Sequence, residues 1–108
     1  MIRTFFIALT AAAVLLSQSA VAAGDPVRGK AKSAACAACH NVDGNSQMPI
    51  YPRLAGQNAD YLVHALSSYQ NGRRKNEIMK GMAAALSAQD IQDLAAYFSA
   101  QNGLIAKR

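Results

Sequence analysis

Two cysteines and a histidine stand within five consecutive residues of this 108-residue chain, in the order Cys36-Ala37-Ala38-Cys39-His40. One turn of helix-like backbone brings the two thiols to the same side, and the histidine follows directly. This C-x-x-C-H spacing is typical of haem attachment, in which the thiols form thioether bonds with the haem vinyl groups and the histidine binds iron. We therefore expect one covalently attached haem c, bound through Cys36 and Cys39, with His40 as the first axial ligand of its iron.

The cysteine pair has two other interpretations. A C-x-x-C thiol–disulfide centre uses the same spacing, but it is expected within a thioredoxin-like βαβ unit, and the sequence lacks the alternating pattern of strands. A zinc site needs more ligands than the chain offers, because there is no second cysteine pair and His64 is the only other histidine. Haem attachment is the interpretation that uses all three residues of the motif.

An iron atom held by His40 alone has an open sixth position, and four side chains could fill it. Met48 follows only eight residues later, which is too close in sequence to reach the opposite haem face easily. His64 is expected on a helix, at the surface or near a haem propionate. Met79 and Met82 lie in an expected loop that can fold over the far side of the haem. The residues alone leave the choice between these two methionines open.

The rest of the chain carries three helical patterns and no alternation typical of strands. Each pattern opens on a residue that caps helices well: Asp25 before Pro26, then Asn58, then Ser87 with Asp90 three residues later as a capping box. The expected helices are 25–36, 58–71 and from 87 onward, and the expected loops are 41–57 and 73–81. These patterns predict a small all-α domain with three main helices around the haem.

The N-terminal residues have the order of a secretory signal peptide. Arg3 precedes an uncharged, mostly apolar stretch at 4–16, and the Ala-Val-Ala sequence at 20–22 offers an A-x-A cleavage site. The apolar stretch is shorter than the ~20 residues that cross a bilayer. We therefore expect cleavage of residues 1–22, a mature domain of residues 23–108 without stable membrane insertion, and a periplasmic location.

Basic residues outnumber acidic residues by 11 to 6, which gives a formal net charge of +5 at pH 7. The excess is not collected in a stripe, and the only basic run, at 73–75, is expected in a solvated loop. We therefore expect no nucleic acid and instead redox partner proteins with acidic docking surfaces. A domain this small has a limited core, so we expect the bound cofactor to complete it.

Three more groups of residues follow the cysteine motif. They are Pro52-x-Leu54-x-Gly56, Met79-x-Gly81-Met82, and a closing segment from Leu86 to Phe98. With the C-x-x-C-H motif, they make the sequence resemble the class I cytochromes c. It is most similar to the short bacterial single-haem type, which also occurs as each half of tandem dihaem cytochromes c. The resemblance covers residues 24–101 and implies the class I cytochrome c fold.

The resemblance implies roles for residues beyond the cysteine motif. Met79, the first methionine of its group, would be the axial thioether ligand opposite His40, with Met82 as the next choice. Pro52 would accept a hydrogen bond from Nδ1–H of His40 with its backbone carbonyl, which orients the ring and strengthens its donation to iron. Leu54 would pack on the haem.

The family pattern also predicts how the first and last helices meet. Gly29 would let the first helix cross closely over the third, near Tyr97 and Phe98. This sequence has Lys32 and Ser33 where many relatives place an aromatic or large aliphatic side chain. We therefore expect less tight packing at this crossing than in those relatives.

Iron held between an imidazole and a thioether is suited to electron transfer. The thioether favours ferrous iron and raises the reduction potential relative to two imidazoles, and with both axial positions filled there is no site for oxygen or peroxide. We therefore expect a one-electron carrier in a respiratory or dehydrogenase electron-transfer chain, and not an enzyme. The alternative is a haem enzyme or ligand sensor with a labile sixth iron position, although the sequence supplies no distal acid–base pair.

Overall fold

The computed structural model describes residues 21–103, and the regular structure in this part of the chain is all helical. The all-α class is confirmed, with five helices within these residues, two of them beyond the three main helices predicted. They are α1 (Pro26–Lys32), α2 (Ala34–His40), α3 (Ala59–Gln70), α4 (Glu77–Ala83) and α5 (Ala88–Ser99). Residues 1–20 of the expected signal peptide lie outside the described residues. None of the described helices is long and apolar enough to cross a membrane.

Ser33 divides the first expected helix in two. Asp25 caps α1 as predicted, because its side chain accepts a hydrogen bond from the backbone N–H of Val27 at 2.7 Å. At the other end of α1, the hydroxyl of Ser33 donates to the carbonyl of Lys30 at 2.8 Å. A serine that binds a nearby backbone carbonyl competes with continued helix. The prediction of one helix over 25–36 is therefore wrong, and the cysteine motif occupies a helix of its own, α2.

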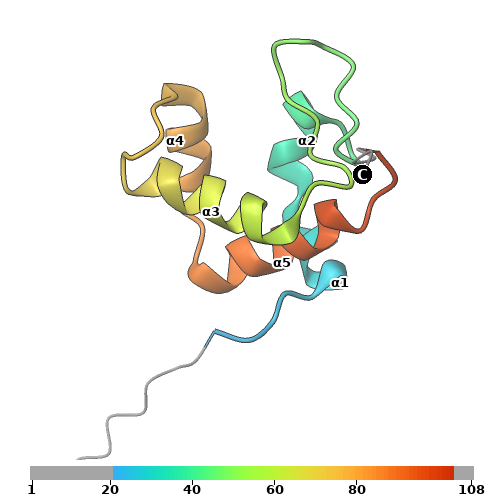
Figure 1. Cartoon of the computed structure of the whole chain (residues 1–108), viewed down its shortest axis with the longest axis horizontal. Helices are drawn as coiled ribbons and strands as arrows, with labels where there is room; N and C mark the ends of the chain where they lie inside the picture. The colour runs from blue at the N-terminus through green and yellow to red at the C-terminus, as the bar shows by residue number, and fades with distance from the viewer. Residues whose placement is uncertain (1–20, 104–108) are drawn as a thin grey trace, which may run out of the picture.

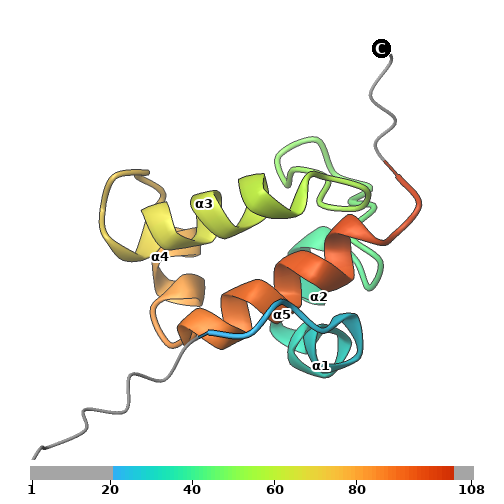
Figure 2. The ribbon, with the colours of Figure 1, turned by 60° about the horizontal axis from the view of Figure 1, so that its bottom comes forward.

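The helices α3 and α5 pack against each other and form the core. Both begin where the capping residues predict. The side chain of Asn58 accepts from the backbone N–H of Asp60 at 2.9 Å, and Ser87 with Asp90 forms a complete capping box. The buried core residues are Leu62, Leu94, Ala95, Tyr97 and Phe98. In Figure 2, α5 runs between α3 on one side and α1 on the other.

Gly29 is the point where α1 crosses α5. A Cβ atom at this position would lie 2.0 Å from the carbonyl oxygen of Asp93 and 2.8 Å from Cβ of Tyr97. Only glycine allows two backbones to approach this closely. The predicted close crossing at Gly29 is therefore confirmed, and Tyr97 lies at the contact as expected.

A buried carboxylate secures the same crossing. The side chain of Asp93 is 0% exposed and accepts hydrogen bonds from the backbone N–H of Asp25 and from the side chains of Arg28, Lys32 and Gln89, at 2.9 to 3.1 Å. The hydrogen bonds from the Arg28 guanidinium hold the pKa of the Asp93 carboxyl well below its usual range. Lys32 thus contributes an ion pair to the crossing, and the helices meet closely at Gly29, although looser packing was expected.

The region of Met79 is helical, although a loop was predicted for 73–81. The side chain of Asn76 accepts from the backbone N–H of Met79 at 3.0 Å and so caps the N-terminus of α4, and Glu77 is in the first turn. An N-terminal cap and an early acidic residue are both helix-starting signals. Gly81 lies inside the helix. Because glycine has a poor helix propensity, the segment was assigned to a loop despite these signals.

The helices α2 and α4 lie on opposite sides of a gap above α3, as Figure 1 shows. The chain crosses from one side to the other along α3, because α3 begins near the loop that follows α2 and ends near α4. Residues 36–40 and residues 77–83 are therefore far apart in sequence but belong to facing elements.

Candidate haem-binding site

Two adjoining cavities lie between the facing helices. The first has a volume of about 150 Å³ and is bordered by α2, α3, α5 and the loop after α2, and the second has a volume of about 240 Å³ and is bordered mainly by α2, α4 and that loop. Both cavities are lined by Cys36, His40, Pro52, Tyr69 and Met79. Because they share these residues, the two cavities are described together as one site.

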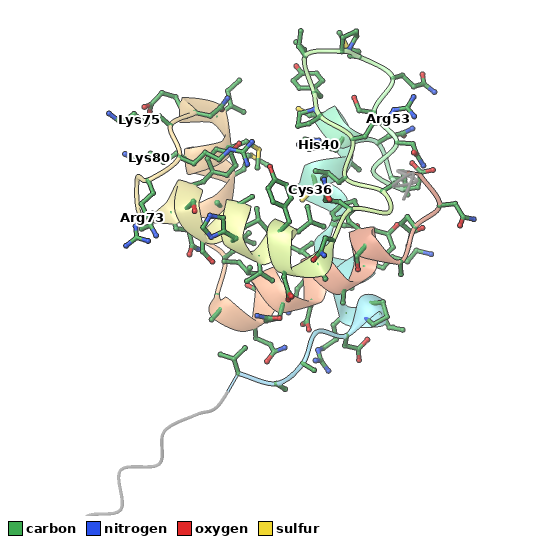
Figure 3. The ribbon with its side chains drawn as sticks, viewed as in Figure 1. Cys36, His40, Arg53, Arg73, Lys75 and Lys80 are labelled. Atoms are coloured by element: carbon green, nitrogen blue, oxygen red, sulfur yellow. The ribbon has the colours of Figure 1, made fainter. Side chains whose placement is uncertain are left out.

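The cysteine motif forms one wall of this site. Figure 3 shows Cys36 and His40 on the side of α2 that faces α4. His40 is buried, Cys36 and Cys39 are half-buried, and both cysteines are free thiols. Burial raises the pKa of the Cys36 thiol, whereas the reactive cysteine of a thiol–disulfide centre has a lowered pKa. Cys36 therefore lacks the lowered pKa of an activated thiolate.

A backbone carbonyl fixes the ring of His40. Its Nδ1 atom lies 2.8 Å from the carbonyl oxygen of Pro52, so Nε2 is the ring nitrogen left for another ligand. The ring of Tyr51 also borders the imidazole in an edge-on arrangement, with 6.4 Å between the ring centroids. This is the contact that the family resemblance implies for Pro52, and its role toward a bound haem stays a prediction.

Gly44 holds the loop that carries Pro52 in place. Its carbonyl oxygen accepts hydrogen bonds from the backbone N–H groups of Leu54 and Ala55, at 2.8 and 3.2 Å. Gly44 has φ of +80°, and a Cβ atom there would lie 2.8 Å from the ring of Phe98. Leu54 is half-buried, packs against the core and lines the first cavity. The family resemblance predicts that it packs on the haem there.

Of the four candidates for the sixth ligand, Met79 alone lines both cavities. It is half-buried on α4, opposite His40. Met82 is 43% exposed and lines only the second cavity, whereas Met48 is 55% exposed and His64 is exposed, and both lie outside the two linings. The arrangement therefore favours Met79 over Met82.

Two polar side chains that the sequence analysis overlooked anchor α4. The amide of Gln70, at the end of α3, donates to the backbone carbonyls of Ala83 and Leu86 at 2.8 and 2.7 Å. The cap from Asn76 secures the other end of α4. Met79 thus lies on a short helix held at both ends. In the sequence, Asn76 directly before Glu77 is the pattern that could have predicted the start of this helix.

The linings fit a large, flat, mostly apolar group with iron at its centre. The walls of the first cavity are chiefly aliphatic and aromatic, including Leu54, Leu94 and Phe98. Two thiols, an imidazole nitrogen and a thioether face the site, which are the donors that haem c uses. Within residues 21–103, no three His, Cys, Asp or Glu side chains are grouped for a metal ion bound by protein ligands alone. The donor set therefore fits haem.

Comparison with known proteins decides the family. The family model for cytochrome c matches residues 26–101. The chain belongs to the cytochrome c family. Members of this family carry covalently bound haem c with iron, and Cys36, Cys39 and His40 supply its C-x-x-C-H motif.

Several relatives of this cytochrome c are similar over most of the described residues. Cytochrome c4 of Pseudomonas aeruginosa is 46% identical over 86 residues, which are 80% of this chain and 43% of that protein. Cytochrome c-554(548) of Halomonas halodenitrificans is 46% identical over 82 residues, 73% of this chain and 99% of that protein. The crystal structure of reduced cytochrome c4 from Pseudomonas stutzeri has a TM-score of 0.72 at 46% identity, covering 77% of this chain and 48% of that chain. The matched part of this chain therefore covers less than half the length of these cytochrome c4 relatives.

Proposed function

We propose that this chain is a periplasmic, single-haem electron carrier that passes one electron at a time and is not itself an enzyme. Cys36 and Cys39 would hold the haem through thioethers, and iron would lie between His40 and Met79. The observation that supports this most strongly is that His40 on α2 and Met79 on α4 line the same two cavities from opposite sides.

The bound haem would supply one-electron oxidation and reduction at its iron, and the protein groups would control it. The carbonyl of Pro52 holds the Nδ1–H of His40, which directs Nε2 into the site and increases its basicity. Met79 would present its sulfur from the capped helix α4. With both axial positions occupied by side chains, a small-molecule substrate has no open position, which favours a carrier over an enzyme or ligand sensor.

The apolar walls support the same function. Side chains such as Leu54, Leu94 and Phe98 exclude water from the site and lower the local dielectric. A low dielectric disfavours the extra positive charge of the oxidised state and so raises the reduction potential. The rigid packing of α3 and α5 behind these side chains would keep the geometry similar in both redox states.

Export of the chain rests on the N-terminal sequence. Removal of residues 1–22 would leave the mature domain 23–108, and haem would be attached after export. N-terminal sequencing of the protein purified from the periplasm would show Ala23 as the first residue. A protein that keeps Met1 or fractionates with membranes would contradict the proposed cleavage.

The basic groups beside α4 suggest the chemistry of the redox partners. Arg73, Lys75 and Lys80 are exposed around the α3–α4 loop and on α4 (Figure 3), and none of them takes part in an ion pair within residues 21–103. They would attract a partner with an acidic docking surface. Relatives include the electron acceptor of thiosulfate dehydrogenase in Thiomonas intermedia and the cytochrome subunit of sulfide dehydrogenase in Chlorobaculum tepidum.

An anionic redox reagent can test this attraction without a known partner. Electron transfer to ferricyanide should slow several-fold in Lys75→Glu at low salt, and the difference should vanish at high salt because ions screen exposed charges. Lys30→Glu is the matched control, because Lys30 is exposed on α1, far from α4 (Figure 1). Equal slowing in the two variants would remove the case for a basic docking site near α4.

The central test of the function is a mass and optical analysis of the purified exported protein. The mass should include one haem, and the oxidised protein should show the near-red charge-transfer band of sulfur bound to iron. Met79→Ala should abolish this band and Met82→Ala should keep it. A protein without covalent haem would refute the proposal. A haem protein without the band, able to bind external ligands, would favour the enzyme or sensor alternative.

A further inference from the structure

Arg74 is held at the mouth of the first cavity by two tyrosines. Its Nη1 donates to the hydroxyl of Tyr61 at 3.1 Å, and its guanidinium lies over the ring of Tyr69, 5.0 Å from the centroid. Its backbone N–H donates to the carbonyl of Ser68 at 3.0 Å. Two contacts therefore hold the guanidinium and a third holds the backbone, in a segment that was expected to be only a solvated loop.

The guanidinium of Arg74 has no anionic partner in the described part of the chain. The ion pairs within residues 21–103 all belong to Arg28 and Lys32, at the α1–α5 crossing. Arg74 nevertheless lines the first cavity, whose walls are mostly apolar. An arginine that is oriented in advance at the edge of an apolar cavity is suited to bind a carboxylate there, because its planar fork matches that group in two hydrogen bonds.

Haem brings two carboxylates to this site. Its propionates are on the half of the ring opposite the vinyl groups, so they point away from the thioether bonds. Cys39 lines only the second cavity and Cys36 lines both, whereas Arg74 and Tyr61 line only the first. The polar groups at the mouth of the first cavity are thus on the side away from Cys39, where propionates are expected.

We propose that Arg74, positioned by Tyr61 and Tyr69, binds a haem propionate and thereby raises the reduction potential of the iron. This proposal rests on the haem attachment described above. A propionate carries negative charge that favours the oxidised iron, and the guanidinium of Arg74 offsets that charge. Arg74 would contact the haem directly, Tyr61 and Tyr69 are the positioning residues, and none of the three takes part in the electron transfer itself.

Arg53 and Gln57 also line the first cavity and are the competing candidates. Neither shows a side-chain contact within residues 21–103 that would fix it at the cavity, whereas Arg74 has two aromatic partners. Gln57 accepts a hydrogen bond from the backbone N–H of Asn58, which uses its amide oxygen locally. An oriented guanidinium loses less conformational entropy on binding, which favours Arg74.

A pair of charge-matched variants tests the proposal in the holoprotein. Arg74→Gln and Arg73→Gln each remove one positive charge from adjacent residues, and Figure 3 shows Arg73 at the outer side of the α3–α4 loop. Arg73 does not line either cavity. The reduction potential should fall in both variants, and the fall in Arg74→Gln should be several times larger. Equal shifts in the two variants would mean that Arg74 acts only as a surface charge and would overturn the proposal.

Two further variants report on geometry and not on charge. Arg74→Lys keeps the charge but loses the planar fork, so it should recover only part of the potential. Tyr61→Phe removes the hydroxyl that positions Arg74, and it should lower the potential less than Arg74→Gln. The resonance Raman propionate bending band, which responds to hydrogen bonding, should shift in Arg74→Gln and stay unchanged in Arg73→Gln.

A crystal structure of the holoprotein gives the direct result. A propionate oxygen within hydrogen-bonding distance of the Arg74 guanidinium is expected, and propionates bound only by Arg53 or by solvent would overturn the assignment. The proposed function is tested separately in the same preparation. A polypeptide without covalent haem refutes that function, whereas covalent haem with an unshifted Raman band refutes only the role of Arg74.

Discussion

The two faces of α5 are completed in different ways. On the face toward α1, the carboxylate of Asp93 is buried and fully paired, and the backbone of α1 lies directly against it at Gly29. On the face toward α3 and α2, Leu94 and Phe98 line the first cavity. The first face is satisfied by groups of the protein itself, and the second borders the cavity where we propose that the haem binds.

The two faces thus have different roles: one packs two helices together, and the other lines the cavity. A buried charge demands exact local partners, and the α1–α5 crossing supplies all of them from one chain. The cavity face instead presents an apolar wall, and in the proposed function four sulfur or nitrogen donors around it would hold the haem. We therefore expect the contacts at the crossing to be set by the chain and the positions of α2 and α4 by the bound haem, while the fold as a whole needs both.

The largest effect is expected from removing the haem attachment. Cys36→Ala/Cys39→Ala should yield a largely unfolded polypeptide, because a small domain with one complete face has too little buried apolar surface. Circular dichroism and thermal melting of the purified variant would show low helicity and no cooperative transition. A folded variant that melts cooperatively without haem would show that the cavity face needs no cofactor.

The next largest difference in stability is expected between substitutions at two glycines, one at the α1–α5 crossing and one on α4. Gly29→Ala places a Cβ atom 2.0 Å from a backbone carbonyl and should cost about 3 kcal/mol in free energy of unfolding. Gly81→Ala meets no atom within 4 Å on α4 and should stabilise the helix by up to about 1 kcal/mol. Chemical denaturation of both holoproteins measures the contrast. Similar changes in the two variants would contradict the close crossing.

Acid should weaken the α1–α5 face through Asp93. Because hydrogen bonds from Arg28 lower the pKa of this carboxyl below its unfolded value of about 3.9, its stabilising effect is complete above that pH and is lost as the pH falls. Asp93→Asn should therefore lower Tm strongly at neutral pH and progressively less in acid. Asp90→Asn, whose carboxylate is 27% exposed, should have a smaller effect. Parallel Tm curves for wild type and Asp93→Asn across acidic pH would contradict this account.

The smallest effect is expected at the cap of α4. Asn76→Ala removes the acceptor for the backbone N–H of Met79 and should weaken α4 by about 1 kcal/mol. The near-red sulfur–iron band should then disappear at a lower temperature than global unfolding. Asn58→Ala removes the cap of α3 and serves as the control, because the band and the fold should be lost together. Loss of both signals together in Asn76→Ala would mean that α4 does not open independently.

Local chemistry made the cysteine motif and most helix starts predictable. The caps at Asp25, Asn58 and Ser87 act within one turn of chain, so sequence alone was sufficient. The helix break at Ser33 depends on a hydrogen bond from its hydroxyl to a nearby backbone carbonyl. The residue types alone do not predict whether this hydrogen bond forms. Helix α4 was missed because Gly81 outweighed the cap of Asn76.

Contacts between residues distant in sequence account for the features that the sequence did not predict. Asp93 is paired with residues more than 60 positions earlier, such as Arg28 and Lys32, and no local pattern distinguishes this buried aspartate from the other polar residues of α5. Arg74 belongs to a basic run that suggested a solvated loop, but Tyr61 and Tyr69, on the neighbouring helix, bring it to the cavity. The roles of the candidate haem residues stay predictions until the holoprotein is measured.

Iron-edge X-ray absorption of the holoprotein tests the central claim most directly, because it reports which atoms surround the metal. Wild type and Met82→Ala should each show one sulfur neighbour together with nitrogen neighbours from the porphyrin and His40. Met79→Ala should lose the sulfur and keep the nitrogens. A sulfur neighbour that persists in Met79→Ala, or that is missing in the wild type, would contradict iron held between His40 and Met79.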